Sequence, residues 1–144
     1  MRLIHLTAIL ALTACSRSGA ASPLTQNDWT NGLQACSANK LSFRDGQIAY
    51  YPAGQPPLVM YKIVSMSPAK DDPSVTEVVV APTDSVIAQA QRDGLNNAAS
   101  LRPLMGFKVS GKHLALAYMR HAPGDPAYAP GASAQYFDLV ACPR

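Results

Sequence analysis

The chain has 144 residues, 48% hydrophobic and 15% charged, and its 12 basic and 9 acidic side chains give a net charge of +3. This composition excludes a largely disordered protein, because disordered chains are poor in apolar residues and rich in charge. The charges form no long run of one sign, so the sequence gives no support for binding to nucleic acid.

The first 14 residues have the pattern of an export signal. Arg2 precedes an apolar stretch from Leu3 to Ala14, which is interrupted only by His5 and two threonines. A helix that spans a bilayer needs about 20 apolar residues, and this stretch is shorter. We therefore expect residues 1–14 to be a signal peptide that is removed.

The end of this stretch, Leu12-Thr13-Ala14-Cys15, resembles the lipobox of bacterial lipoprotein precursors. The resemblance implies cleavage before Cys15, acyl chains such as palmitate on its thiol and new amino terminus, and a membrane anchor outside the cytoplasm. In this family an Asp after the lipidated cysteine favours the inner membrane. Ser16 at that position implies the periplasmic face of the outer membrane, with the inner membrane as the alternative. A plain secretory signal with a free Cys15 thiol is the other alternative.

The remaining chain is long enough for one domain with a single core. Residues 16–26 are rich in Ser, Ala and Gly, which predicts a flexible tether. Together with the lipidated Cys15 that the resemblance implies, this tether makes up residues 15–26. Residues 27–144 then form a single β-rich periplasmic domain. Removal of Arg2 with the signal leaves 11 basic and 9 acidic side chains, a net charge of +2.

With Cys15 assigned to lipid, Cys36 and Cys142 are the two cysteines left. Two thiols in an oxidising compartment usually pair, so we expect a disulfide between them. It would close a loop of roughly 100 residues, for which the chain-entropy model gives up to about 4.7 kcal/mol. A metal pair or a redox couple is the alternative, but neither cysteine has a second one at Cys-x-x-Cys spacing.

The first half of the domain alternates apolar and polar residues as strands do. Residues 27–35 form either one helical turn or a first strand. Residues 40–51 predict a hairpin around Asp45-Gly46, because both residues tolerate the positive φ of a tight turn. Residues 58–66 are apolar on both faces, which suits a central strand, and residues 75–81 are β-branched enough to form another.

The period becomes helical at residue 84. Pro82-Thr83-Asp84 can cap a helix on which Val86, Ile87 and Ala90 share a face, and Gly94 suits its C-terminal stop.

Residues 102–109 and 113–120 predict a second hairpin around Ser110-Gly111. Residues 122–133 contain three prolines and predict a long loop, and residues 135–142 form a last strand that ends at the disulfide.

These elements predict a mainly β fold of about seven short antiparallel strands in a small sandwich or open barrel, with one short helix near residues 84–93. The stretch from Trp29 through Cys36 to the hairpin residues Leu41-Ser42-Phe43 and Gly46-Gln47-Ile48 loosely resembles small uncharacterised proteobacterial lipoproteins. That resemblance implies the fold and supplies no activity.

The chain carries none of the common motifs of hydrolases, nucleotide-binding proteins or metalloproteases. His113 and His121 would lie about 26 Å apart on a regular strand, too far to share a metal ion. The loop of residues 93–97 lacks the spacing of a calcium loop. We therefore expect no catalytic residues, no metal and no cofactor, and a protein that is not an enzyme.

Tyr51 and Tyr128 lie beside proline-containing loops, and we expect them to contact a partner, because tyrosine is a rigid contact residue with a polar tip. The leading hypothesis is a lipid-anchored periplasmic binding protein, most concretely an inhibitor or immunity factor for a cell-wall-degrading enzyme. The chain resembles membrane-bound lysozyme inhibitors in architecture only, because their signature loop residues are missing. The alternative is an accessory or structural lipoprotein of an envelope secretion or assembly complex. Either role implies contact with another envelope protein and none with nucleic acid.

Overall fold

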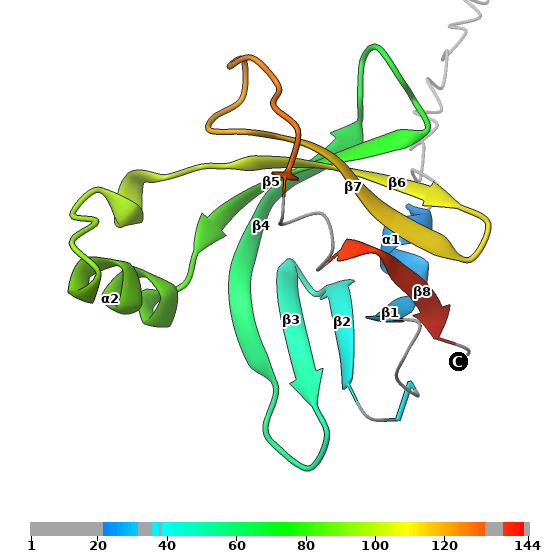
Figure 1. Ribbon diagram of the computed structural model, residues 1–144, viewed down its shortest axis with the longest axis horizontal. Coiled ribbons are helices and arrows are strands. Elements are labelled where there is room, and N and C mark those ends of the chain that lie inside the picture. The colour runs from blue at the N-terminus through cyan, green and yellow to red at the C-terminus, as the bar shows by residue number, and fades with distance from the viewer. Residues whose placement is uncertain (1–21, 32–35, 38, 132–136, 143–144) are drawn as a thin grey trace, which may run out of the picture.

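The computed structural model describes residues 22–31, 36–37, 39–131 and 137–142. Within them, eight antiparallel strands form a closed barrel in which sequential strands pair and the last strand pairs with the first (Figure 1). The strands are β1 (Asp28–Asn31), β2 (Asn39–Arg44), β3 (Gln47–Pro52), β4 (Leu58–Pro68), β5 (Val75–Pro82), β6 (Leu104–Ser110), β7 (His113–Arg120) and β8 (Leu139–Cys142). The helices are α1 (Pro23–Gln26), α2 (Asp84–Arg92) and the 3-10 turn η1 (Ala98–Ser100).

The mainly β fold with short antiparallel strands is confirmed, and the barrel is closed where the sequence suggested a sandwich or an open barrel. The strand beyond the expected seven is β1, whose segment the sequence left open between a helical turn and a strand. It is a strand because its backbone pairs on both sides, through Trp29↔Leu41 with β2 and Thr30↔Val140 with β8. This pairing closes the barrel and buries Trp29 completely.

Both predicted hairpins are confirmed. β2 and β3 meet at Asp45-Gly46, where φ is +54° and +68°, as a tight two-residue turn requires. β6 and β7 meet at a turn that begins with Gly111. Phe43 of the first hairpin and Phe107 of the second are fully buried, and their ring centroids lie 5.0 Å apart. The two hairpins therefore share one core.

β4 is a central strand as expected, because it pairs with β3 and with β5, but much of it is exposed. Leu58 is 53% exposed and Val64 is 57% exposed. The pairing with β5 shifts between Ile63 and Ser65, so Val64 is the extra residue of a β-bulge. The outer face of a closed barrel is covered only where a helix or loop packs on it, and β4 is largely bare.

The flexible tether was expected to extend to residue 26, but the folded part begins earlier. α1 is capped by Ser22, whose hydroxyl accepts a hydrogen bond from the Leu24 amide at 3.3 Å. Leu24 is fully buried, and its carbonyl accepts a 3.0 Å hydrogen bond from the Trp29 indole. α1 packs against β2 and β6. These contacts make α1 part of the core.

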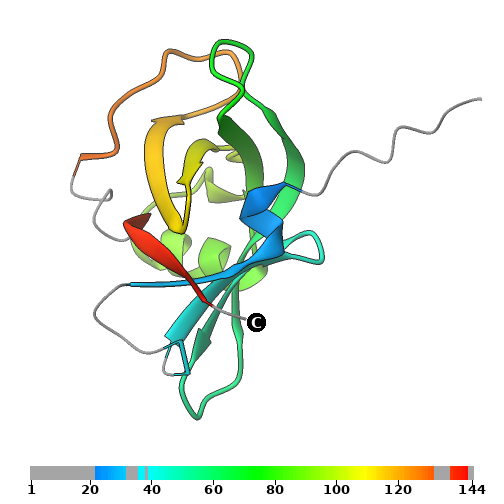
Figure 2. The same ribbon diagram turned by 90° about the vertical axis from the view of Figure 1, so that its right-hand side faces the viewer.

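α2 forms where the helical period predicted it, and Gly94 follows it with φ at +86°. The Thr83 side chain does not cap it, because the hydroxyl instead lies 3.3 Å from the carbonyl oxygens of Val59 and Met60. No residue of α2 is fully buried. α1 and α2 lie at opposite ends of the barrel, and Figure 2 looks from the α1 side with α2 behind (Figures 1 and 2).

The last strand is shorter than expected. β8 begins at Leu139, residues 137–138 precede it, and residues 135–136 lie outside the described part of the chain. The loop after β7 is confirmed as far as residue 131 and is held to β7 by paired backbone hydrogen bonds between Met119 and Tyr128. The predicted disulfide is confirmed, because Cys36 is bonded to Cys142 across 106 residues with a Cα–Cα distance of 5.5 Å.

Candidate functional site

A half-open cavity of about 550 Å³ occupies the end of the barrel where β2, β4, β6 and β8 begin. α1 lies at the other end, next to the start of β5, where the Ser22 and Thr76 hydroxyl oxygens are 3.3 Å apart. The barrel is therefore filled at one end and hollow at the other. We call the hollow end the open end.

The cavity wall is mainly apolar and rich in methionine and aromatic side chains. Three methionines from three different strands contribute flexible thioether chains, which adapt to irregular shapes. The main apolar residues of the wall are Trp29, Leu41, Met60, Met105, Met119 and Phe137. An empty apolar cavity leaves its lining atoms without contact partners, and this one is open on one side. Water or a ligand must therefore fill it.

Trp29 gives this wall a built-in reporter. It is the one tryptophan of the chain, its side chain is fully buried, and it lines the cavity. Its indole nitrogen is already used by the carbonyl of Leu24. Trp29 therefore offers an apolar surface to the cavity.

Some polar groups of the cavity wall already form a hydrogen bond or an ion pair with another described residue, and others do not. The Thr30 hydroxyl donates to the Asn39 carbonyl at 2.7 Å, and the Lys40 ammonium lies 3.1 Å from the Asp28 carboxylate. The hydroxyls of Tyr50 and Tyr61 make no hydrogen bond within the part of the chain that the structure describes. Among the described residues of the cavity wall, these two phenols are therefore the polar groups that remain available to a ligand.

Most of the exposed large hydrophobic side chains belong to segments at the open end. Of the six large hydrophobic side chains that are exposed among the described residues, only Val64 lies away from it, in the middle of β4. The other five occupy strand ends or connections at this end: Tyr51, Leu58, Leu95, Leu101 and Tyr128. Among the described residues, the open end therefore carries most of the exposed large hydrophobic side chains.

Tyr51 and Tyr128, the expected partner contacts, are each 38% exposed. Tyr51 lies near the end of β3, with the Lys40 ammonium 5.7 Å from its ring centroid. Tyr128 stacks on His121 with ring centroids 4.8 Å apart. The structure thus has Tyr51 on β3 and Tyr128 in the loop after β7, both at the open end.

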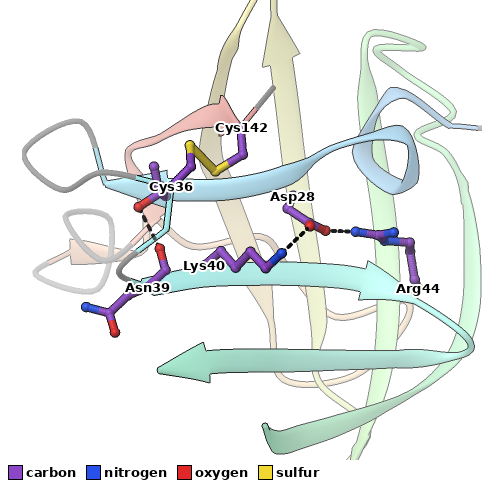
Figure 3. The surroundings of a disulfide bond; sticks show 7 residues. Asp28, Cys36, Asn39, Lys40, Arg44 and Cys142 are labelled. Carbon is purple, nitrogen blue, oxygen red and sulfur yellow. Dashed lines mark hydrogen bonds and ion pairs between the residues drawn. A yellow bond between two sulfur atoms is a disulfide. The ribbon is translucent and has the colours of Figure 1, made fainter. Parts of the chain in front are cut away.

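Asp28 organises the outer face of β1 and β2. Its side chain is only 11% exposed and forms ion pairs with Lys40 and Arg44, which lie on β2 on either side of it (Figure 3). The disulfide lies beside this group, because Cys142 pairs with Asp28 across β1 and β8 (Figure 3). One carboxylate shared by two cations leaves this face with a net positive charge.

A second cavity of about 360 Å³, with several charged side chains in its wall, lies on the outer face of β5, β6 and β7. Tyr118 donates a 2.6 Å hydrogen bond to the Glu77 carboxylate, and the Arg120 guanidinium lies 3.9 Å from the same oxygen. Burial of the Tyr118 phenol, reinforced by its hydrogen bond to Glu77, raises its pKa to about 12. This arrangement holds the phenol in its neutral form.

Neither His113 nor His121 lines the open-end cavity. Cys15, the predicted lipidation site, is outside the described residues. His113 begins β7, His121 follows its end, and both are exposed. Across residues 22–31, 36–37, 39–131 and 137–142, no three metal-ligating side chains come together.

The sequence did not indicate the cavity. Its walls come from seven strands and one loop, and its apolar residues look locally like ordinary core residues. The spare methionines on β4, β6 and β7 were the signal that could have raised the question. In the described part of the chain, no helix has the length and apolar character to span a bilayer. Comparison of the chain with protein-family models, curated proteins and solved structures gives no match.

Proposed function

We propose that this protein is a non-enzymatic binding lipoprotein of the bacterial envelope, anchored through Cys15, whose open barrel end is its binding face. The observation that carries this proposal is that five of the six exposed large hydrophobic side chains of the described residues belong to strand ends or connections at the open end of the barrel. The cavity at the same end can accept a side chain or a ligand, and its wall is formed by other residues.

The proposed anchor would orient this face. Ser22 follows Cys15 by seven positions, so the membrane would lie within about 25 Å of α1 even if that segment were fully extended. Because α1 is opposite the open end, the binding face would point away from the membrane and toward the cell wall. This orientation suits an inhibitor or immunity factor that binds a cell-wall-degrading enzyme.

The anchor is tested by Cys15→Ser in cells that receive labelled palmitate. We expect the wild-type chain to take up label and to stay with the membrane fraction, and Cys15→Ser to do neither. Cys36→Ser is the matched control, because it removes a different thiol and should keep the label. Label on Cys15→Ser, or membrane retention without label, would contradict the anchor.

The partner class is tested with purified muramidases and amidases acting on peptidoglycan. The protein should slow at least one of these enzymes, and Tyr51→Ser combined with Tyr128→Ser should weaken the effect at least 10-fold by removing two aromatic contacts. Val64→Ser, at a residue that is more exposed than either tyrosine but lies away from the open end, should keep full inhibition. If no enzyme is slowed and the protein instead binds a secretion or assembly component through the same tyrosines, the accessory role replaces inhibition.

A further inference from the structure

We propose that the open-end cavity is a binding site for a single acyl chain, whose carboxyl or ester oxygen is held by the hydroxyls of Tyr50 and Tyr61. This inference goes beyond the proposed partner and depends on neither the anchor nor an enzyme target. It rests on the size of the cavity, the chemistry of its wall and its two uncommitted phenols.

The dimensions fit one small ligand. The interior of an eight-stranded barrel is either filled by side chains or holds one small molecule. Ligand cavities usually measure about 300–1,000 Å³. The 550 Å³ found here lies within that range. The apolar core residues Leu24, Phe43 and Phe107 fill the α1 half, so the space ends inside the barrel.

The wall selects an apolar and flexible occupant. Among the described residues that line it, Lys40 is the only one with a formally charged side chain, and its ammonium is engaged by Asp28 (Figure 3). Met60, Met105 and Met119 have unbranched side chains that can repack around chains of different length. A hydrocarbon chain matches this lining better than a charged metabolite does.

The two phenols give the site its polar end. Tyr118, outside this cavity, shows how this barrel uses a partly buried phenol, because its hydroxyl is bound to Glu77. Tyr50 and Tyr61 have no such acceptor in the described part of the chain, although they line the cavity. A carboxylate or ester oxygen accepts hydrogen bonds and donates none, which complements two phenol donors.

Trp29 makes the proposal directly measurable. Bromine atoms quench indole fluorescence on contact, and Trp29 is the only indole of the chain. The protein used is the chain from residue 15 onward with Cys15→Ser, so that it carries no lipid of its own. All strands and the core lie within this chain.

Titration with a 16-carbon fatty acid brominated along its chain should quench Trp29 saturably, with one acid bound per protein. Vesicles of a brominated phosphatidylcholine form the second arm, which asks whether the chain comes from a membrane lipid. Quenching in either arm supports the proposal and identifies the source. Absence of quenching in both arms overturns it, even if the protein inhibits a cell-wall enzyme, so the two proposals fail separately.

Two sets of variants locate the site. Tyr50→Phe combined with Tyr61→Phe should weaken binding of the acid about 10-fold through the lost hydrogen bonds, and should leave binding of a brominated alkane unchanged. Tyr51 is next to Tyr50 on β3 but does not line the cavity, so Tyr51→Phe should change the binding of neither probe. Met60→Glu should abolish binding of both probes, and its circular dichroism should remain that of the parent. Equal loss of acid and alkane in the double variant would overturn the role of the phenols.

Discussion

The phenol end of Tyr118 lies over Gly106 on the neighbouring strand, so closely that a Cβ atom at Gly106 would be 2.6 Å from the ring. Gly106 pairs with Tyr118 on β7 and with Glu77 on β5. The missing side chain therefore lets the phenol reach across β6 to Glu77, with a hydrogen bond of 2.6 Å. One glycine makes a three-strand contact possible on the outer face of the barrel.

Gly106→Ala tests this contact. We expect it to lower the free energy of unfolding by about 1–2 kcal/mol, because the new methyl group displaces the Tyr118 ring. In a Tyr118→Ala background the same change should be neutral or slightly stabilising, because alanine loses less backbone entropy than glycine in a strand. Urea unfolding of the four proteins gives the coupling energy. An equal cost in both backgrounds would show that the ring is not the cause.

The raised pKa of Tyr118, about 12, predicts a loss of stability at alkaline pH. The phenol stays neutral in the folded state while the unfolded phenol ionises near its ordinary value of 10, so its contribution is complete below pH 10 and is lost between pH 10 and 12. For this partly exposed group the loss should be roughly 1 kcal/mol, after allowance for screening by solvent.

Ultraviolet titration of the six tyrosines measures the shift. The phenol that ionises last in the wild type should be missing from Tyr118→Phe, and the urea midpoint of Tyr118→Phe should fall less between pH 10 and 12. Identical titration curves for the two proteins would refute the assignment.

Removal of the disulfide should destabilise the barrel substantially. Cys36 and Cys142 close a loop of 106 residues, and Cys142 lies on β8, which forms the closing seam with β1. Cys36→Ser combined with Cys142→Ser should cost about 2–5 kcal/mol, because the unfolded chain gains freedom and the seam loses its covalent link. Thermal unfolding measures the change. Cys15→Ser should unfold with the wild-type midpoint, and a large shift there would mean that its thiol takes part in the fold.

Asp28 and Asp72 allow a mostly buried ion-paired carboxylate to be compared with an exposed one. The Asp28 side chain is 11% exposed and pairs with two cations, whereas the Asp72 side chain is 50% exposed and lies 3.6 Å from Lys108. Asp28→Asn should cost about 1–3 kcal/mol, because it leaves two neighbouring cations without their shared carboxylate. Asp72→Asn should cost less than about 0.5 kcal/mol, since water screens exposed pairs. Urea unfolding that ranks Asp72 above Asp28 would contradict this reading of burial.

Several elements of the fold could be predicted from short-range sequence patterns alone. The Asp45-Gly46 turn and the alternation on both sides of it determine a hairpin wherever it lies in the molecule, because turn type and side-chain period are short-range properties. The helix at Asp84–Arg92, with Gly94 after it, follows from the same kind of rule. The Cys36–Cys142 bond followed from counting thiols.

Tertiary structure decided what depends on distant partners. The segment around Trp29 could have been a helical turn or a strand. It is a strand because β8, more than 100 residues later, pairs with β1 and closes the barrel. The burial of Leu24, the reach of Tyr118 over Gly106 and the hollow among Met60, Met105 and Met119 arise only when that closure sets the register. A strand's pattern specifies which side chains share a face, but only the pairing of all eight strands specifies what that face encloses.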